Sequence, residues 1–257
     1  MNSVLPAVIC YREIYRYAEL SKAAYLDFPE LKREFGNTVS ITELDSSRVR
    51  VVLINHERSD IQWVAIRGTA NPRNVVVDGK VKILREPRLG VYLHGGFLRA
   101  AQEAFDAIKP NLDLGRQIRI TGHSLGGAVA LILAALLSED GAGFQLGRTI
   151  TFGQPMVTDS NGVKVLKKYP LLRVVNRWDP VAILPLILSR THFELRPTVF
   201  YHHVGPQLTL YRDREPKYSE PGRLITLVLG YKWLIKNHFM DLYLQRLNTL
   251  LASDPDN

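Results

Sequence analysis

The sequence predicts an α/β fold in which a mostly parallel central sheet carries helices on both of its faces. Strands rich in β-branched residues alternate with helices in the middle of the chain, and this alternation is typical of parallel pairing. The chain has 257 residues, 46% of them hydrophobic, which is enough to bury one large core. Because no repeat or low-complexity linker divides it, we expect a single domain over residues 1–257.

The expected elements follow from local patterns, taken in chain order. Apolar residues at helical spacing predict an opening helix over residues 11–25. Three β-branched segments separated by polar turns predict a meander of strands at 39–44, 49–55 and 61–66. Later, helices are expected at 97–108 and 125–137, and strands at 117–121, 149–152 and 172–176. Since parallel sheets bind ligands beyond the carboxyl ends of their strands, we expect the functional site there.

The composition narrows the class of partner. The formal net charge of +8 favours anionic surfaces such as phospholipid headgroups or nucleic acid. No zinc-ligand spacing, recognition-helix signature or aromatic RNA-binding motif accompanies this charge, so we expect no nucleic-acid partner. The longest apolar stretch, residues 224–235, is shorter than the roughly 20 residues that a membrane-spanning helix needs.

The compartment stays open at this point. The single cysteine, Cys10, excludes a disulfide within the chain and fits a reducing compartment without requiring it. Residues 1–10 lack the basic region and the unbroken apolar run of a secretory signal. We therefore expect a protein that is cytoplasmic or secreted by a route that these residues do not reveal.

The segment Gly122-His123-Ser124-Leu125-Gly126 matches the pattern G-x-S-x-G between an expected strand and an expected helix. By chance alone the pattern occurs in roughly one chain in ten of this length. The context is more specific, because the two glycines leave room for a sharp turn that lifts the serine hydroxyl above the sheet edge. The helix start directs backbone N–H groups to the same point, and the Leu125 amide is a natural oxyanion donor. The alternative is a serine that only caps the helix.

The acid that would serve such a serine should follow a later strand. Asp179 comes directly after the segment 172–178, and Pro180 holds it in extended geometry at the end of that strand. Asp159 is the other acid after a strand, but its setting is that of a helix N-cap. Asp179 is therefore the better candidate.

Histidines downstream of the acid are candidates for the base: His192, His202, His203 and His238. His202 and His203 lie in an alternating segment, 200–204, that we expect to be a strand. His238 lies at an expected junction between a loop and a helix. For any one of these histidines a packed or exposed structural role is the ordinary interpretation, so the residues alone do not identify the base.

Seven motifs, in family order, resemble the class 3 lipases, a family of α/β-hydrolases that includes fungal triacylglycerol lipases, feruloyl esterases, phospholipases A1 and diacylglycerol lipases. The motifs are AIRGT at 65–69, HGGF at 94–97, TGHSLGGA at 121–128, TFGQP at 151–155, NRWDPV at 176–181, YHHVG at 201–205 and HFMDLYL at 238–244. The resemblance implies the α/β-hydrolase fold. It also implies hydrolysis of a lipid-like ester such as a triacylglycerol, through a Ser-His-Asp triad and an acyl-enzyme.

By this resemblance Ser124, Asp179 and His238 are the catalytic triad, and Thr69 and Leu125 form the oxyanion hole. The mechanism needs no metal ion and no organic cofactor. Phospholipase A1 activity and acyl transfer to an alcohol by the same triad are alternatives. A non-catalytic lipid-binding module is a further alternative, and the complete set of triad residues argues against it.

The resemblance places a lid in the segment 69–93, where apolar residues alternate with cations. Such a segment could cover Ser124 in water and face an anionic lipid surface when it opens. The alternative is that the valines at 75–77 and the apolar residues at 81–84 belong to strands or to the core. This sequence departs from the family in two places: the segment lacks the tryptophan that many lids carry, and residues 154–156 replace a frequent Pro-Arg pair.

Overall fold

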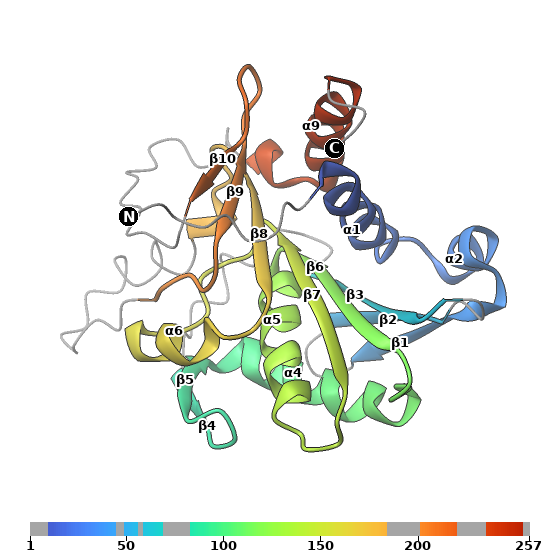
Figure 1. Cartoon of the computed structure of the whole chain (residues 1–257), viewed down its shortest axis with the longest axis vertical. Coiled ribbons are helices and arrows are strands. Elements are labelled where there is room, and N and C mark those ends of the chain that lie inside the picture. Colours follow the sequence, from blue (N-terminus) through green and yellow to red (C-terminus); the bar gives the residue numbers. More distant parts are fainter. Residues whose placement is uncertain are drawn as a thin grey trace.

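A computed structural model describes residues 10–44, 49–55, 59–68, 83–183, 201–219 and 235–253 (Figure 1). Its helices are α1 (Tyr11–Ala23), α2 (Phe28–Phe35), α4 (Gly95–Ile108), α5 (Leu125–Ser138), α6 (Ser160–Leu166) and α9 (Met240–Ser253), with short 3-10 helices η1 (Gly36–Thr38), η2 (Lys109–Asn111), η3 (Val181–Ile183) and η4 (Ile235–His238). Its strands are β1 (Val39–Leu44), β2 (Val49–Asn55), β3 (Ile61–Arg67), β4 (Ile83–Glu86), β5 (Val91–His94), β6 (Gln117–His123), β7 (Gln145–Phe152), β8 (Leu171–Asn176), β9 (Gln207–Leu210) and β10 (Lys217–Ser219).

The central sheet has eight described strands in the order β1-β2-β3-β6-β7-β8-β9-β10. The first three pair antiparallel, as the expected meander requires. From β3 to β9 every pair is parallel, and β10 returns antiparallel at the far edge. The carboxyl ends of β3, β6, β7 and β8 therefore lie along one edge of the sheet. The expected mostly parallel α/β fold is confirmed.

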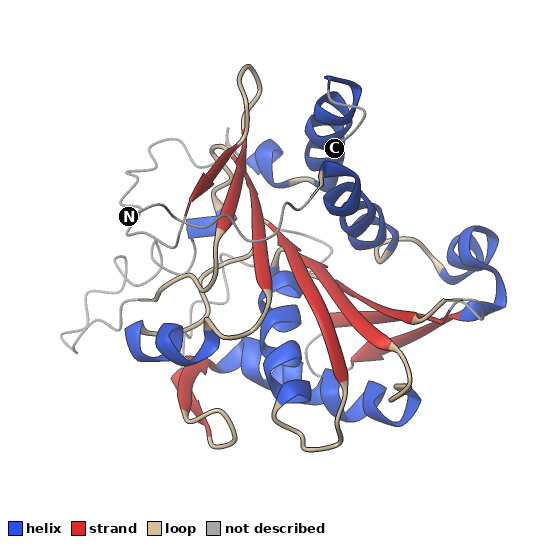
Figure 2. Cartoon of the chain, viewed as in Figure 1, coloured by secondary structure: helices blue, strands red, loops and turns tan. Residues whose placement is uncertain are grey.

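Helices cover both faces of this sheet (Figures 1 and 2). On one face α4 and α5 form the largest core with residues of β2, β3 and β6. On the other face α1 and α9 pack against β7, β8 and β9. Helix α5 is buried on all sides between Gly126 and Leu137, which explains why its sequence is apolar around the whole helix. Each fully buried leucine or isoleucine there contributes roughly 1.5–3 kcal/mol relative to an exposed one.

The expected helices and strands of the sheet are present with small shifts at their ends, the largest being the start of β7 at Gln145 instead of 149. One expectation is wrong. Residues 201–204 do not form a strand, because only His202 makes an isolated bridge to Thr158. Gly205 follows in a left-handed conformation (φ 72°) and turns the chain before β9 begins. Phe200 lies outside the described residues.

Most of the candidate lid segment lies outside the described residues, which end at Gly68 and resume at Ile83. The described remainder forms the hairpin of β4 and β5. Val91 and Leu93 of this hairpin are buried, and Leu84 packs against the same core. Within the described ranges, no helix combines the length and the apolar character that crossing a bilayer would demand.

Candidate active site

Ser124 occupies a sharp turn between β6 and α5. Its backbone angles are φ 60° and ψ −130°, in a region that residues with a side chain rarely adopt and that costs roughly 1–3 kcal/mol. Its hydroxyl makes no capping hydrogen bond to α5 and has no partner among the described residues, although it is buried. The structure thus argues against the alternative in which Ser124 only caps α5. The Ser124 hydroxyl stabilises no other described part of the fold by a hydrogen bond.

The turn requires glycine at two positions, because a side chain would clash with the backbone at either one. A Cβ atom on Gly122 would lie 2.3 Å from the carbonyl oxygen of Gly126, and one on Gly126 would lie 2.2 Å from the carbonyl oxygen of Ile66. A hydrogen bond also fixes the backbone of Ser124, whose N–H donates to the carbonyl oxygen of Phe152 at 2.9 Å. The surrounding strands therefore enforce the strained conformation of Ser124.

The end of β3 reaches the same turn through Gly68. A Cβ atom on Gly68 would lie 3.1 Å from Cβ of Ser124 and 2.7 Å from the carbonyl oxygen of His123. Thr69, one of the two expected oxyanion donors, follows Gly68 in the chain but lies outside the described residues. Leu125, the other, is the first residue of α5, where backbone N–H groups have no partner within the helix.

Asp179 and His238 form a buried pair. Nδ1 of His238 lies 3.0 and 2.9 Å from the two carboxylate oxygens of Asp179, and both side chains are fully enclosed. Because an ionised carboxylate only accepts hydrogen bonds, Nδ1 carries the proton and Nε2 is left with a lone pair. This Nε2 is buried and without a partner among the described residues. The lone pair of Nε2 is thus available to accept a proton.

Tyr243 of α9 holds the carboxylate of Asp179 from a second side. Its hydroxyl donates to Oδ2 at 2.6 Å and accepts from the N–H of Asn176 at 3.0 Å. Burial, followed by the negative charge of Asp179, raises the pKa of Tyr243 well above its ordinary value, so the hydroxyl stays a donor. The N–H of Val181 donates to Oδ1 at 2.9 Å. Three donors, including His238, therefore fix the carboxylate.

His123 connects the serine turn to the loop that carries the base. Its Nε2 lies 2.6 Å from the carbonyl oxygen of His238, and its Nδ1 lies 2.8 Å from the hydroxyl of Tyr25. A carbonyl oxygen only accepts, so Nε2 donates and Nδ1 accepts from Tyr25. Burial, and then the neighbouring His238, lower the pKa of His123 well below its ordinary value. His123 is accordingly a neutral imidazole in one fixed tautomer.

Gly153, directly after β7, leaves the space that the Asp179–His238 pair fills. It has a left-handed conformation (φ 56°), and a Cβ atom on it would lie 2.6 Å from Oδ2 of Asp179 and 2.8 Å from Nδ1 of His238. Only glycine fits here, for reasons of both conformation and space.

The structure thus gathers Ser124, Asp179 and His238 at the carboxyl edge of the sheet, although the Ser124 hydroxyl and Nε2 of His238 are not hydrogen-bonded to each other. The other candidates lie elsewhere. Asp159 caps α6 by accepting from Gly162 at 2.7 Å, as expected, and Nε2 of His203 donates to the carbonyl oxygen of Ala182 at 2.6 Å. His192 is outside the described residues. No group of His, Cys, Asp and Glu side chains among those that the structure describes could hold a metal ion.

Sequence patterns did not identify Tyr243, His123, Tyr25 or Gly153 as parts of this site. Three of them lie inside motifs that were used for the resemblance, at 121–128, 151–155 and 238–244. Tyr243 follows His238 by more than one helical turn within the motif 238–244, and this spacing is the one local feature that could have indicated a role for Tyr243. Nothing local indicates Tyr25, which lies 98 residues before its partner.

Comparison with known proteins shows which family and which fold this chain resembles. The family model for lipase (class 3) matches residues 63–189. The chain is 32% identical over 164 residues to secreted mono- and diacylglycerol lipase 1 of Fusarium solani, covering 57% of this chain and 43% of that protein. It is 33% identical over 135 residues to a lipase of Rhizomucor miehei, covering 48% of this chain and 37% of that protein. The matches span less than half the length of these relatives.

Solved structures show the same fold. Lipase II from Rhizopus niveus superposes with a TM-score of 0.68 at 18% identity, covering 90% of this chain and 94% of that one. The lipase of Rhizopus microsporus var. chinensis gives 0.67 at 19% identity, with 89% and 85% covered. The expected α/β-hydrolase fold is confirmed.

Proposed function

The chain belongs to the class 3 lipase family, and from this premise we propose that it is a carboxylic ester hydrolase acting on lipid-like esters. Ser124 is the nucleophile, His238 the general base and Asp179 the acid that orients the base. The observation that carries the proposal is the buried His238–Asp179 pair, whose unpartnered Nε2 lies at the same sheet edge as the strained serine.

The proposed reaction transfers an acyl group in two halves. His238 Nε2 takes the proton of the Ser124 hydroxyl while its oxygen attacks the ester carbonyl carbon. The imidazolium then gives that proton to the leaving alcohol as the ester C–O bond breaks. In the second half a water molecule gives a proton to His238 while its oxygen attacks the acyl carbonyl carbon. The imidazolium then returns that proton to the Ser124 oxygen as the acyl C–O bond to Ser124 breaks, which releases the carboxylic acid and restores the serine hydroxyl. Asp179 holds the tautomer and stabilises the imidazolium in both halves.

The oxyanion of each tetrahedral intermediate would lie at the amino terminus of α5, where Leu125 is the first residue and its N–H is the proposed donor. Thr69 is the second proposed donor. The close approach of Gly68 to Ser124 supports this assignment, because Thr69 is the next residue of the chain. Truncation of Thr69 to alanine removes the hydroxyl but leaves its backbone donor, so the expected loss in kcat is at or below the hundredfold to thousandfold typical of one deleted donor, about 2.7–4 kcal/mol.

The substrate class follows from the relatives, one of which is named a mono- and diacylglycerol lipase. We infer that acylglycerols, or esters with similar acyl chains, are the substrates. Phospholipase A1 and acyltransferase activities use the same residues. Relative rates on p-nitrophenyl esters, triacylglycerols and phospholipids distinguish a phospholipase A1 from a lipase. Partitioning of the acyl-enzyme between water and an added alcohol distinguishes an acyltransferase from a hydrolase.

Ser124→Ala tests the proposal directly. We expect this variant to lose ester hydrolysis and labelling by a fluorophosphonate, while its far-UV circular dichroism and melting temperature stay close to wild type. Ser160→Ala, at the exposed start of α6, is the matched control and should keep both. Labelling that persists in Ser124→Ala would place the nucleophile elsewhere.

A further inference from the structure

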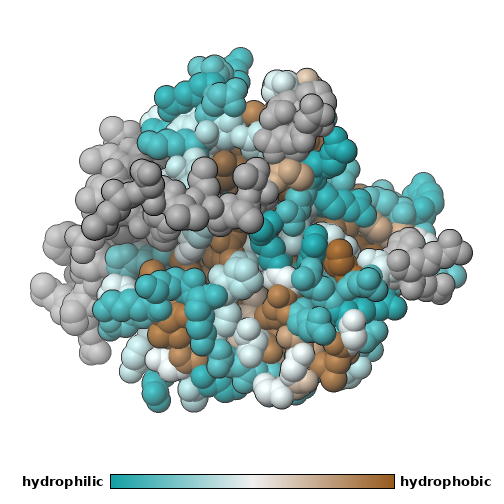
Figure 3. Space-filling model, in the orientation of Figure 1, coloured by the Kyte–Doolittle hydropathy of each residue, from teal (hydrophilic) through white to brown (hydrophobic). Residues whose placement is uncertain are grey.

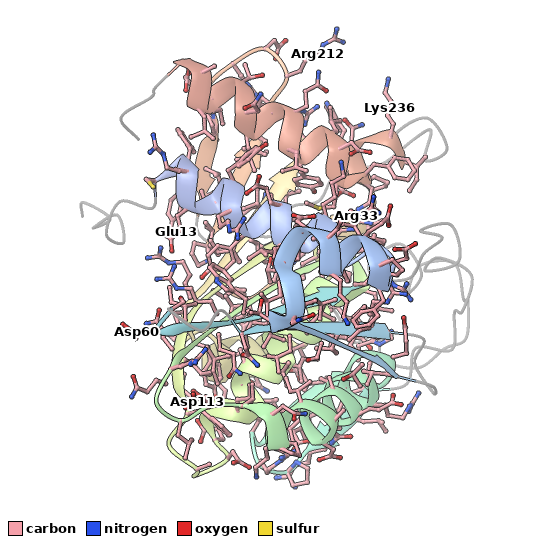
Figure 4. All side chains as sticks on the ribbon, turned by 90° about the vertical axis from the view of Figure 1, so that its right-hand side faces the viewer. Glu13, Arg33, Asp60, Asp113, Arg212 and Lys236 are labelled. Carbon is pink, nitrogen blue, oxygen red and sulfur yellow. The ribbon has the colours of Figure 1, made fainter. Side chains whose placement is uncertain are left out.

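A groove of about 1120 Å³ beside α9 collects positive charge. Five cationic side chains line it: Arg177, Arg212, Arg214, Lys236 and Arg246. Two acidic residues, Asp213 and Asp241, also line it, and Asp241 is bound by Lys22 of α1 at 2.6 Å. Figure 4 shows Arg212 and Lys236 at the end of the molecule that α9 forms, and Asp113 at the opposite end. The groove therefore has a net positive charge that its own residues do not cancel.

The groove cations lack the acidic partners that about half of the other described cations have. Among the described residues none of the five forms an ion pair within 4.0 Å, whereas Arg50, Arg119, Arg148 and Lys168 are each paired with a glutamate. Nε of Arg246 is buried without a hydrogen-bond partner. Burial, and also repulsion by Arg212, lower the pKa of Arg246. An anion in the groove would relieve this repulsion.

Two large apolar side chains stand at the groove with about half of their surface exposed. Trp178 is 49% exposed and Phe239 is 47% exposed. Trp178 adopts a left-handed conformation (φ 70°), which is strained for so bulky a residue, and the guanidinium of Arg177 lies 4.0 Å from its ring centre. Exposing such rings to water does not stabilise the fold. An aromatic ring flanked by cations suits the boundary between headgroups and acyl chains of a bilayer.

The groove adjoins the candidate active site. Trp178 directly precedes Asp179, and Phe239 directly follows His238. Asn237, which lines the groove, accepts from Asn176 at the end of β8 with its carbonyl oxygen at 3.0 Å. The tip of the β9–β10 connection, which carries Arg212 and Arg214, is a hydrophilic projection at the top of the view in Figure 3. Basic and aromatic side chains thus lie on the loops that bear the acid and the base.

We propose that this groove is a docking surface for an anionic phospholipid bilayer, in which its cations contact lipid phosphates and Trp178 and Phe239 insert below them. The charge and the exposed rings together favour a lipid surface over a nucleic acid, for which the chain has no recognition motif. The purpose of this surface rests on the proposed lipid-ester hydrolysis. The binding itself requires no turnover, so it is tested in the full chain carrying Ser124→Ala.

The first measurement is sedimentation with vesicles of phosphatidylcholine alone or mixed with phosphatidylglycerol. We expect binding to the anionic vesicles only, weakened by salt because screening shortens the reach of the charges. The groove variant neutralises three exposed cations: Arg212→Gln, Arg214→Gln and Lys236→Gln. Its control neutralises three exposed cations in α2, in α6 and at the C-cap of α6: Arg33→Gln, Lys164→Gln and Lys167→Gln. Both variants have the same net charge.

The groove variant should bind anionic vesicles at least about tenfold more weakly, since each basic residue near such a surface contributes roughly fivefold. The control should lose about twofold or less. Trp178→Phe should abolish the blue shift in tryptophan fluorescence that anionic vesicles cause in the parent.

Equal losses in the two triple variants, or a parent without a blue shift, would overturn the proposal. Groove-dependent binding to RNA or heparin that matches vesicle binding would make the surface a general polyanion site instead. Hydrolysis is absent from every arm, so failure here leaves the proposed activity untouched.

Discussion

Nε2 of His123 donates a hydrogen bond of 2.6 Å to the carbonyl oxygen of His238, across 115 residues of sequence. The residue before the proposed nucleophile thereby fixes the backbone of the proposed base. The centres of the two imidazole rings lie 4.5 Å apart, and the ring planes are tilted by 31° to each other. A neutral His123 avoids placing a second positive charge beside His238 when the latter is protonated during turnover.

Tyr25→Phe tests this connection, because it removes the hydroxyl that donates to Nδ1 of His123 and helps to hold the ring in place. We expect kcat to fall by about tenfold or less with KM nearly unchanged, and unfolding to become easier by roughly 0.5–1.5 kcal/mol, the usual net contribution of one hydrogen bond. Steady-state kinetics and urea unfolding measure both. Tyr92→Phe, at a half-exposed ring of β5, is the control. An increase in KM with kcat unchanged would mean that Tyr25 contacts the substrate instead of positioning His238.

Tyr243→Phe should impair catalysis through the acid. The variant removes the donor at 2.6 Å from Oδ2 of Asp179 and leaves the N–H of Asn176 without its acceptor. A buried group left without a partner costs roughly 1–3 kcal/mol, so we expect a lower melting temperature and a lower kcat. If kcat per folded molecule equals that of wild type, Tyr243 only stabilises the fold.

Gly153→Ala should disrupt the Asp179–His238 pair. The added Cβ would lie 2.6 Å from Oδ2 of Asp179, in addition to the strain of a left-handed alanine. Gly141 has the same backbone handedness (φ 79°) with open space around it, so Gly141→Ala reports the strain alone, about 1 kcal/mol. We expect Gly141→Ala to retain activity and Gly153→Ala to lose most of it. Equal activities would show that the pair tolerates displacement.

His238→Ala and His203→Ala should separate catalysis from stability. Loss of the proposed base is expected to lower kcat by several orders of magnitude. His203 bonds the carbonyl oxygen of Ala182 in the segment after Asp179, so its loss should mainly lower the free energy of unfolding. A stable His203→Ala protein that loses catalysis as severely would reverse the assignment of the base.

His94 should make the protein less stable in acid. Burial, the largest cause, lowers its pKa from 6.5 to about 4, and its Nδ1 accepts from the N–H of Phe97 at the start of α4. Below pH ~6.5, the pKa of an unfolded histidine, the unfolded chain binds a proton at His94 that the native state does not bind. The free energy of unfolding therefore falls as the pH decreases, and this loss reaches roughly 3 kcal/mol near pH ~4. His123 and His203 act in the same direction.

His94→Asn is the variant that isolates this effect, because asparagine keeps the acceptor that caps α4 but does not titrate. Urea midpoints measured between pH ~7 and pH ~4.5 should fall less steeply for the variant than for wild type. Identical slopes would remove His94 from the acid sensitivity.

The sequence by itself determined the alternation of strands and helices, the glycine-flanked serine turn and, through family resemblance, Asp179 and His238. These features are local: they depend on periodicity, on turn residues and on motifs a few residues long. Only the tertiary structure decided that Tyr243 holds Asp179, that His123 holds His238 and that Gly153 leaves room for both. Partners in the first two contacts stand 64 and 115 residues apart, and Gly153, Asp179 and His238 come from the end of β7, the segment after β8 and η4. Their approach is set by the packing of α9 and α1 on the sheet face, which no local pattern encodes. The basic groove has the same origin, because its cations come from the segment after β8, the β9–β10 connection, η4 and α9 and come together only after folding.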